Sequence, residues 1–244
     1  MKTFDLATGW YWFVLMAIVS YLIGCFNFAV LIAKHKHKDV HKIGSGNPGT
    51  MNISREFGLK VGLLNFLLDA MKGGVPAVIS YFIFRNYVFA GSTVVVSDVT
   101  RYFCGTFVVI GHIFPVTMKF KGGKGIASTL GLFWMCMACE KWWFFLIGFV
   151  MLVGVVFYIA LTEWGSMGSL LGVTGFSIWQ GFVFYFRYEG FFNGFVVWAF
   201  MMLLALNFLT WFAHRKNIVR LFAGEEHHTS VKKLSKGKRG MKNM

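Results

Sequence analysis

Residues 190–213 read GFFNGFVVWAFMMLLALNFLTWFA, a run without a single charged side chain. A helix needs about 20 residues to cross the hydrocarbon layer of a membrane, so this run is long enough to span it. Three further uncharged runs of more than twenty residues cover 6–33, 142–162 and 164–186. The whole chain holds only 3 Pro, and helices satisfy their own backbone polar groups in lipid. These runs predict an all-α, polytopic integral membrane protein.

Seven membrane-spanning helices are expected, at about residues 9–33, 73–91, 102–118, 125–139, 142–161, 165–186 and 191–213. The fourth is short for a span, and residues 57–68 are expected to form a half-helix that leads into the second. The first run is too long for the apolar region of a signal peptide and lacks a clear small-residue cleavage site, so a retained helix is expected. A single membrane-embedded domain is therefore predicted over residues 1–226, followed by a basic, disordered tail at 227–244.

Basic residues are distributed unevenly over the two ends of these spans. The formal net charge is +14, from 24 Lys+Arg against 10 Asp+Glu. One end receives the segments 34–60, 119–124 and the tail after 214, with six, three and nine Lys/Arg residues, and the other end receives five. Because positive charge concentrates in cytoplasmic loops, the N-terminus is expected outside and the C-terminus in the cytoplasm. Nucleic-acid binding is disfavoured, because these residues lie at loop ends and not in a soluble basic domain.

The first polar motif follows the first predicted span and reads Gly44-Ser45-Gly46-Asn47-Pro48-Gly49-Thr50-Met51-Asn52, then Arg55. Glycines permit close approach of the backbone to a ligand, so consecutive amides can point at an anion. Ser45, Asn47 and Asn52 add neutral donors, and Arg55 can pair with a phosphate in fork geometry. Considered alone, the stretch is equally well explained as an ordinary Gly/Pro/Asn turn between helices.

The second motif is Lys119-Phe120-Lys121-Gly122-Gly123-Lys124-Gly125 at the start of the fourth predicted span, preceded by His112 in the third. A glycine-flanked lysine run at a helix start offers free N–H groups, a favourable dipole and mobile positive charge, which favour a phosphate ligand. It differs from a Walker A loop, because Gly125 follows Lys124. Anchoring by positive charge would explain the lysines but not the glycines among them. A lone histidine such as His112 is more typical of packing than of catalysis.

The third motif follows the last predicted span and reads His214-Arg215-Lys216-Asn217-Ile218-Val219-Arg220-Leu221, then Gly224-Glu225-Glu226. At helical spacing His214, Asn217 and Leu221 share one face, and Arg220 lies near it. Alone, the motif is typical of a solvated charge cluster beside a membrane. Since all three motifs are predicted at the same end of the spans, together they indicate one anion-binding site.

Three polar residues inside or next to predicted spans extend this site. Asp69 and Lys72 lie three residues apart at the start of the second predicted span, where they either pair to soften their burial or order the site. Ser166 begins the sixth predicted span at the level of the motifs and is a candidate donor, although small serines also serve helix packing.

Two other clusters are assigned to the membrane. The run His35–His41 alternates His with Lys, and the lysines would repel a divalent metal ion, so this run is expected to contact anionic lipid headgroups. Cys136 and Cys139 form a C-x-x-C inside an apolar run without a second pair of ligands, so buried apolar side chains are expected there.

Together the three motifs resemble those of the bacterial membrane glycerol-3-phosphate acyltransferases that use acyl-phosphate as donor. The resemblance runs in order from about residue 9 to 226, and the segments around Asp69/Lys72 and Ser166 share it. It implies a seven-helix fold in the bacterial cytoplasmic membrane, with the active site facing the cytoplasm. The implied reaction moves a fatty acyl group to the 1-hydroxyl of sn-glycerol 3-phosphate and yields lysophosphatidic acid and phosphate, the first step of phospholipid synthesis. It implies neither a cofactor nor a metal. Thr50-Met51 and Lys216 depart from the family's usual Ala-Thr and Glu.

The resemblance implies residues for both substrates. The catalytic set comprises Ser45, Asn47, Lys124, His214 and Asn217. The substrate-binding set comprises Gly46, Asn52, Arg55, Asp69, Lys72, His112, Lys121, Gly122, Gly123, Ser166, Arg220 and Glu226. Glycerol 3-phosphate is assigned to Lys124, Arg55, Ser166, His214 and Asn217. The acyl-phosphate group is assigned to Ser45, Asn47, Asn52 and the Gly122–Gly123 backbone. An exchange of these two sets remains an alternative, and Asp69, Lys72 and His112 are assigned a supporting role.

Two alternatives concern the mechanism and the function. None of the 7 His residues has Asp five positions later, the pattern of soluble acyltransferases. The resemblance implies proton transfer to a phosphate oxygen of the substrate, and His112 as general base is the alternative. A membrane transporter of organic phosphates is the alternative function, disfavoured because the two halves show no internal repeat and the polar residues avoid the midplane. Expected partners are the two substrates, anionic lipids and, by transient docking, the enzyme that makes the acyl-phosphate.

Overall fold

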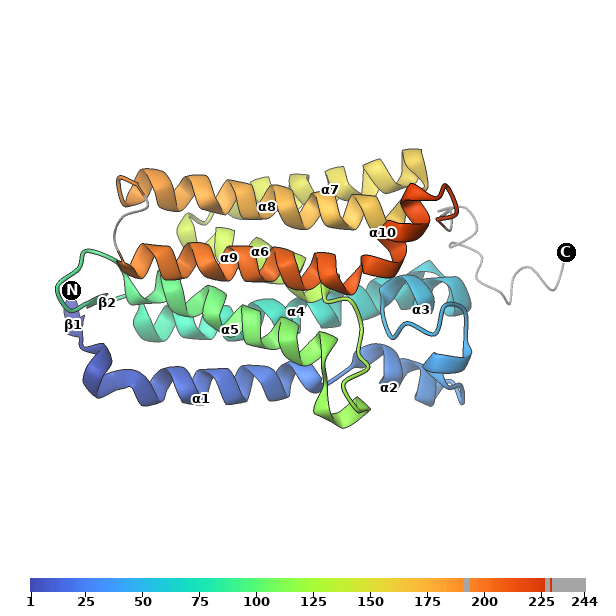
Figure 1. The fold of residues 1–244 in the computed structure, drawn as a ribbon, viewed down its shortest axis with the longest axis horizontal. Coiled ribbons are helices and arrows are strands. Elements are labelled where there is room, and N and C mark those ends of the chain that lie inside the picture. Colours follow the sequence, from blue (N-terminus) through green and yellow to red (C-terminus); the bar gives the residue numbers. More distant parts are fainter. Residues whose placement is uncertain (191–193, 227–228, 230–244) are drawn as a thin grey trace, which may run out of the picture.

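The apolar runs form long helices that lie side by side along one axis of the molecule (Figure 1). The structure is a computed structural model, and it describes residues 1–190, 194–226 and 229. Its α-helices are α1 (Leu6–Cys25), α2 (Phe28–His35), α3 (Thr50–Phe57), α4 (Leu59–Phe84), α5 (Val96–Ile113), α6 (Ile126–Glu140), α7 (Phe144–Thr162), α8 (Gly165–Arg187), α9 (Gly194–Ala213) and α10 (Arg215–Phe222). Two short 3-10 helices, η1 (Val40–Lys42) and η2 (Val116–Met118), and two parallel strands, β1 (Lys2–Phe4) and β2 (Tyr87–Phe89), complete the described part.

Six helical segments of the described chain are long and apolar enough to cross a membrane. They are Leu6–His35, Leu59–Phe84, Val96–Met118, Phe144–Thr162, Gly165–Arg187 and Gly194–Ala213. The helix α6 is apolar but has only 15 residues. The predicted class, a polytopic helical membrane protein, is confirmed. The count of seven spans and the orientation in the membrane stay predictions.

The first predicted span is two helices instead of one. Helix α1 ends at Cys25, Phe26 is extended, and the Asn27 side chain accepts a hydrogen bond from the N–H of Val30 (3.0 Å) to cap α2. Asparagine is among the preferred residues at this cap, because its side chain satisfies a backbone donor at the helix start. The prediction of one uninterrupted helix over 9–33 was therefore wrong at this position, and the break lies close to the first polar motif.

The second predicted span and the half-helix before it are one continuous helix, α4. It begins at Leu59 and ends at Phe84, with Pro76 inside it, so the predicted helical residues 85–91 were wrong. They lead instead into β2, which pairs with the N-terminal strand β1. Asp69 and Lys72 consequently lie near the middle of a helix and not at its start.

The remaining predicted spans agree with helices to within a few residues, except the third. Helix α5 begins at Val96 and ends at Ile113, where Phe114 and Pro115 stop it; a residue before proline disfavours helical backbone. The predicted span over 102–118 therefore began too late, and its last residues form η2, at the end of the membrane-crossing segment Val96–Met118. Residues 191–193 and most of the predicted disordered tail lie outside the described residues.

Small residues bring the helices close together where α6 crosses α4. A Cβ atom on Gly131 would meet the backbone of Ala70, and one on Gly73 would meet the backbone of Ser128. Gly24 and Gly111 make the same kind of close contact between α1 and α5. Such contacts are typical of helix packing in lipid, where no hydrophobic force drives helices together. They fix α4 and α5 against the elements that carry the polar motifs.

The end of the bundle that holds the N-terminus contains a buried network of charged residues. Arg101 is 0% exposed and its Nη2 lies 2.5 Å from Asp98 Oδ1 and 2.7 Å from Glu140 Oε1. Arg187 bonds to the same two carboxylates, and Tyr188 donates to Asp98 (2.5 Å). Two of the five basic residues counted at this end are thus neutralised, which increases the difference in charge between the two ends.

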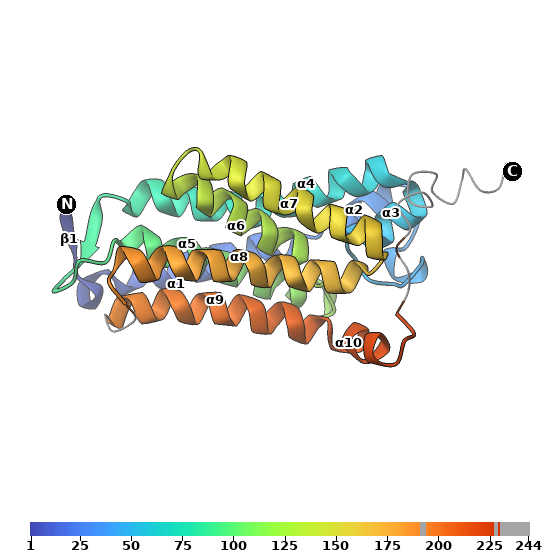
Figure 2. The same cartoon turned by 90° about the horizontal axis from the view of Figure 1, so that it is seen from above.

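The three polar motifs lie together at the opposite end. In Figure 1, α2, α3 and α10 lie at the end opposite the N-terminus, and the segment that joins α5 to α6 lies in the same half of the molecule. Figure 2, turned by 90°, shows the same arrangement. The prediction that the motifs share one end of the spans is confirmed.

Candidate active site

The centre of the candidate site is a chain of hydrogen bonds that joins α6, α8 and α10. Lys124 Nζ, one residue before the cap of α6, donates to Asn217 Oδ1 (2.6 Å). Asn217 Nδ2 donates to Ser166 Oγ (2.7 Å) and to Glu226 Oε1 (2.8 Å), and Ser166 Oγ donates to Glu226 Oε1 (2.5 Å). Arg220 Nε completes the cluster by donating to Glu226 Oε2 (3.2 Å). The second and third motifs and Ser166 are therefore in contact.

A change of helix direction aims the third motif at this cluster. Helix α9 ends at Ala213, and the carbonyl of His214 then accepts from the N–H groups of Asn217 and Ile218 to begin α10. Figure 1 shows α10 leaving the axis of α9 at a clear angle. As a result Asn217 is buried, only 8% exposed, at the inner side of α10.

Arg55 on α3 brings the first motif within electrostatic range of Lys124 and Glu226. Arg55 Nη2 donates to Thr229 Oγ1 (3.2 Å), and the backbone N–H of Thr229 donates to the carbonyl of Glu163 (2.7 Å). Burial lowers the pKa of the Arg55 guanidinium, and the charge of Glu226 partly offsets this. Thr229 belongs to the segment predicted as a basic tail, the rest of which lies outside the described residues.

The site has more cationic than anionic side chains, and their burial disfavours the charged form of the cations. Burial lowers the pKa of Lys124 to about 8. The charges of Arg220 and Arg55 also lower this pKa, whereas the carboxylate of Glu226 raises it. Burial raises the pKa of Glu226, but hydrogen bonds from Ser166 and Asn217 and the charge of Arg220 outweigh it, so the pKa lies below its usual value. A bound anion would relieve this repulsion among the cations.

His214 is a neutral acceptor in this site. Burial, and then the charge of Lys124, lower its pKa to about 4. Its Nδ1 lies 2.8 Å from the carbonyl of Thr210, which only accepts, so the ring proton sits on Nδ1. The other nitrogen, Nε2, therefore presents a lone pair and suits a hydroxyl donor better than a phosphate oxygen.

Asn52 holds the first loop in shape. Its Oδ1 accepts from the N–H of Ser45 (3.0 Å), and its Nδ2 donates to the carbonyls of Val40 (3.3 Å) and Ile43 (3.1 Å). Asn52 is 2% exposed, so its polar atoms serve the loop. Ser45 is exposed and Asn47 is half-buried at the surface of the same loop. Gly46 lies there too, with a positive φ of 69°.

The glycine pair of the second motif differs from its predicted role. The N–H of Gly122 donates to the carbonyl of Ile113 (3.1 Å), and that of Gly123 donates to the carbonyl of His112 (3.0 Å). These amides fold the loop back onto the end of α5, so the assignment of both as phosphate donors was wrong. A Cβ on either residue would collide with His112. Glycine at these two positions therefore allows the loop to pack directly against His112. Free N–H groups remain at the first turn of α6.

The three predicted supporting residues meet below this loop. Lys72 Nζ lies 3.0 Å from Asp69 Oδ1 and 2.7 Å from His112 Nδ1, and all three residues are buried. Lys121, by contrast, is exposed on the loop.

Two asparagines that sequence analysis did not select connect these parts. Asn27 Nδ2 donates to the carbonyl of Pro48 (3.2 Å), and Asn65 Nδ2 donates to Thr50 Oγ1 and Asp69 Oδ2 (both 3.1 Å). Both asparagines interrupt apolar runs. An amide in such a run costs free energy unless it is hydrogen-bonded, and this isolation in the sequence was the available indication.

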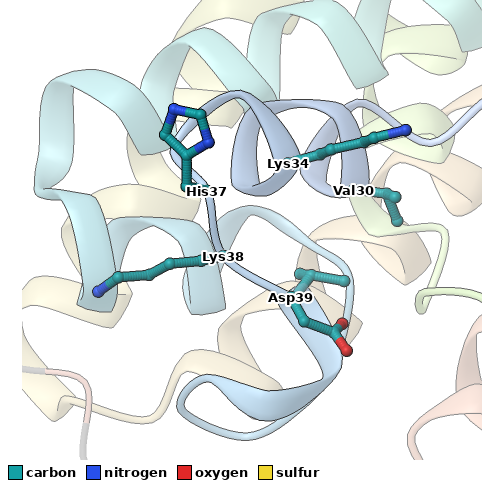
Figure 3. A pocket seen from close by; sticks show the side chains of 6 residues that line it. Val30, Lys34, His37, Lys38 and Asp39 are labelled. Atoms are coloured by element: carbon teal, nitrogen blue, oxygen red, sulfur yellow. The ribbon is translucent and has the colours of Figure 1, made fainter.

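A surface cavity of about 530 Å³ lies beside the site in the His/Lys-rich segment. It is lined by Val30, Lys34, His37, Lys38, Asp39 and Val40. Figure 3 shows the side chains of Lys34, His37 and Lys38 pointing in different directions instead of converging. None of the predicted site residues lines this cavity, so it is separate from the candidate active site.

The model of the glycerol-3-phosphate acyltransferase family matches residues 14–224 of this chain. The chain belongs to this family. A glycerol-3-phosphate acyltransferase of Thermoanaerobacter pseudethanolicus is 36% identical over 214 residues, which cover 87% of this chain and 93% of that relative. One of Mycoplasma pneumoniae is 34% identical, with 86% of this chain and 91% of that relative covered.

Solved structures of an integral membrane glycerol 3-phosphate acyltransferase share the fold. Its glycerol 3-phosphate form has a TM-score of 0.70 at 27% identity and covers 91% of this chain and 98% of that one. Its lysophosphatidic acid form has a TM-score of 0.68, with 91% and 97% covered. Membership of a membrane acyltransferase family agrees with the resemblance that the three motifs indicated.

Proposed function

We propose that this chain transfers a fatty acyl group from acyl-phosphate to the 1-hydroxyl of sn-glycerol 3-phosphate. The relatives carry the name of this acyltransferase, and similar structures are described with glycerol 3-phosphate and with lysophosphatidic acid. The observation that carries the proposal is the hydrogen-bonded chain from Lys124 through Asn217 to Ser166, next to Arg55 and Arg220. These groups suit a doubly charged phosphate at the end of a membrane bundle.

Glycerol 3-phosphate is proposed to bind this cluster. Its phosphate would contact Lys124, Arg55 and Arg220. Ser166 and Asn217, whose O–H and N–H groups are used within the cluster, would position Lys124 beside it. His214, an acceptor at Nε2, would receive a hydroxyl of the glycerol part. Glu226 carries a negative charge, so its proposed part is to hold Ser166 and Asn217 in place and not to contact the phosphate.

The acyl-phosphate group is proposed to lie between the first loop and the start of α6. Ser45 and Asn47 on the first loop and the first-turn amides of α6 would contact its phosphate, since a helix N-terminus favours an anion. Asn52, Gly122 and Gly123 would shape this region without donating to the ligand. The acyl chain would remain in the lipid, next to the apolar surface of the helices.

The proposed reaction depends on the orientation of the two substrates and on fixed positive charge, and it does not require a strong base. The 1-hydroxyl oxygen attacks the carbonyl carbon, the bond from that carbon to the phosphate oxygen breaks, and the leaving phosphate takes the hydroxyl proton. Lysophosphatidic acid and inorganic phosphate result, with atoms and charge balanced. Because phosphate is a good leaving group, fixed cations and orientation supply much of the barrier reduction.

The decisive assay uses the purified chain in detergent with acyl-phosphate and glycerol 3-phosphate. Lysophosphatidic acid and phosphate are expected in equal amounts, and the matched acyl-thioester donor is expected to give none. Lys124→Ala should raise the apparent KM for glycerol 3-phosphate strongly, whereas Lys216→Ala, an exposed change on the same α10 end, should leave it near wild type. A folded protein that makes no product but takes up glycerol 3-phosphate in liposomes would contradict the proposal in favour of a transporter.

The proposed location is the bacterial cytoplasmic membrane with the site facing the cytoplasm. The excess of Lys and Arg at the end that carries the motifs supports this orientation. Anionic lipid headgroups are proposed to contact the basic segment 34–42, and the donor-making enzyme is proposed to dock transiently at the same face. A reporter fused after residue 244 should be active only when it is a cytoplasmic reporter; activity of a periplasmic reporter would reverse the orientation.

A further inference from the structure

The ammonium group of Lys72 joins three elements directly below the candidate active site. Its Nζ lies 3.0 Å from Asp69 Oδ1 on the same helix, and 2.7 Å from Nδ1 of His112 near the end of α5. It also lies 2.8 Å from the carbonyl of Phe26 and 3.3 Å from that of Gly24, at the break between α1 and α2. Lys72 is 6% exposed, so water does not provide these partners.

These four contacts determine which nitrogen of His112 carries a proton. The two carbonyls accept hydrogen bonds from Lys72, and the ion pair with Asp69 keeps its side chain an ammonium, whose third N–H is left for His112. An ammonium group has no lone pair to offer, and Nδ1 of His112 must therefore be the acceptor in the 2.7 Å contact. A neutral imidazole with an acceptor at Nδ1 carries its proton on Nε2.

The protonated nitrogen faces the two loops of the site. His112 Nε2 occupies the space next to Gly123 where a side chain would begin, and the carbonyl of Pro48 from the first loop borders the same space. The carbonyl of His112 also accepts the N–H of Gly123 (3.0 Å). The imidazole is therefore tied to the glycine loop by its backbone and directs an N–H toward the joint between the two loops.

We propose that Lys72 is a positioning residue that keeps His112 as a hydrogen-bond donor to the acyl-phosphate group. This inference rests on the proposed function, and it assigns His112 a chemical role opposite to that of a general base. His112 Nε2–H stabilises the charge that builds on the phosphate oxygen as the bond to the carbonyl carbon breaks. Donors fixed in advance at such an oxygen lower the barrier without moving during the reaction.

A base at His112 conflicts with the same contacts. To take the hydroxyl proton, Nε2 would need a free lone pair, and the ring proton would then sit on Nδ1 and face the Lys72 ammonium at 2.7 Å. Asp69 does not relieve this conflict, because its Oδ1 lies 3.8 Å from His112 Nδ1, beyond hydrogen-bond distance. The hydroxyl proton therefore leaves with the phosphate.

Direct observation of the tautomer tests the first half of the proposal. The full-length chain in detergent micelles, labelled with ¹⁵N-histidine, gives the ring nitrogen resonances, and loss of one set in His112→Gln assigns His112 among the 7 His. At neutral pH we expect an unprotonated Nδ1 and a protonated Nε2. A proton on Nδ1, or on both nitrogens, would overturn the proposal. This measurement needs neither turnover nor a Lys72 variant, so it stands if the proposed function fails.

A pair of variants at one position tests the second half. The amide of glutamine donates from a position close to Nε2 but is not a base. If His112 donates, His112→Gln should keep kcat within about tenfold of wild type and His112→Ala should lose about a hundredfold or more. If His112 is a base, both variants should lose the same large factor, and that result would overturn the proposal. Absence of turnover in the wild-type chain would instead contradict the proposed function.

A third variant separates positioning from packing. Lys72→Met keeps much of the side-chain volume but removes the donor to Nδ1, so the ¹⁵N spectrum should gain a population of His112 with its proton on Nδ1. Its kcat should fall more than its KM for glycerol 3-phosphate rises, because Lys72 does not touch that substrate. An unchanged tautomer together with an unchanged kcat would contradict the role of Lys72.

Discussion

Lys124 is the residue whose chemistry is most sensitive to its surroundings. It is largely buried, two further cations act on it, and Glu226 is the carboxylate that compensates them. With a pKa of about 8, its ammonium loses a proton in a pH range where many enzymes still work. Binding of a phosphate at this residue should therefore depend on pH.

The first prediction concerns that dependence. As pH rises through about 8, Lys124 becomes neutral and loses its attraction for phosphate. The apparent KM for glycerol 3-phosphate should stay level below this pH and rise by up to about tenfold per pH unit above it. Lys124→Arg should remove the inflection, since arginine stays protonated. A pH series of initial rates measures both; an inflection that survives in the arginine variant would assign it to another group.

The second prediction concerns Glu226, whose charge raises the pKa of Lys124. Glu226→Gln keeps an oxygen acceptor for Ser166 and Asn217 but removes this charge. The inflection in KM should therefore move to lower pH than in the wild type. Glu225→Gln, an exposed neighbour, serves as the control and should leave the inflection in place. A shift to higher pH would mean that Glu226 acts on the substrate and not on Lys124.

At the residue scale, sequence patterns selected the right groups but not their partners. Lys124, Asn217 and Ser166 were chosen for their chemistry and their level in the membrane, and the structure brings them into contact. The amides of Gly122 and Gly123 were misjudged. Their acceptors are carbonyls of α5, nine and eleven residues earlier, and no local pattern reveals that the loop folds back onto them.

Among the helices, the crossing of α4 and α6 depends on the absence of side chains. Gly131 meets the backbone of Ala70, which cannot move aside as a flexible side chain could. Helix α4 carries Lys72, and α6 begins at the end of the glycine loop, so the distance between the two helices sets the position of Lys72 relative to that loop.

The third prediction tests this crossing. Gly131→Ala should destabilise the protein by about 1–3 kcal/mol, because the added methyl group forces the backbones apart. Gly154→Ala on α7 is the matched control, since a Cβ there has nothing within 4 Å. It should be neutral or slightly stabilising, because alanine favours helix more than glycine. Thermal unfolding in detergent compares the two; equal melting temperatures would show that the helices yield without cost.

Helix existence was predictable from apolar runs, whereas helix boundaries were not. The break at Asn27 and the continuity of α4 through Lys72 both come from tertiary hydrogen bonds. Lys72 itself misled the prediction, because a charged residue in an apolar run normally marks the end of a span. Here three buried acceptors and an imidazole nitrogen allow it to remain inside one.

For the whole molecule, the buried network of Asp98, Arg101, Glu140 and Arg187 links α5, α6 and α8 at the end away from the site. In the sequence the two arginines were counted as ordinary basic residues of that end. Spacing did not reveal that Glu140 on α6 pairs with both of them, or that Arg187 on α8 reaches Asp98 on α5. Which distant residues form ion pairs is decided by how the helices pack, and neither residue spacing nor composition predicts that packing.

The fourth prediction concerns this network. Arg101→Met should destabilise the protein by about 3–5 kcal/mol, because it leaves buried carboxylates without a full complement of partners. Adding Glu140→Gln should recover part of that loss by removing the surplus negative charge. Arg85→Met, an exposed change at the same end with the guanidinium over Phe82, is the control. Stability in detergent is the measurement, and a double variant no better than the single one would mean that packing dominates.

The same network bears on the order in which the chain enters the membrane during synthesis. Helix α5 brings Asp98 and Arg101 as a neutral pair, and α6 then adds Glu140, which leaves one negative charge in excess. Only α8, emerging last of the three, supplies Arg187 to balance it. A nascent chain that stops after α7 would contain one buried carboxylate without a positively charged partner. Insertion of α8 adds Arg187 and brings the net charge of this network to zero.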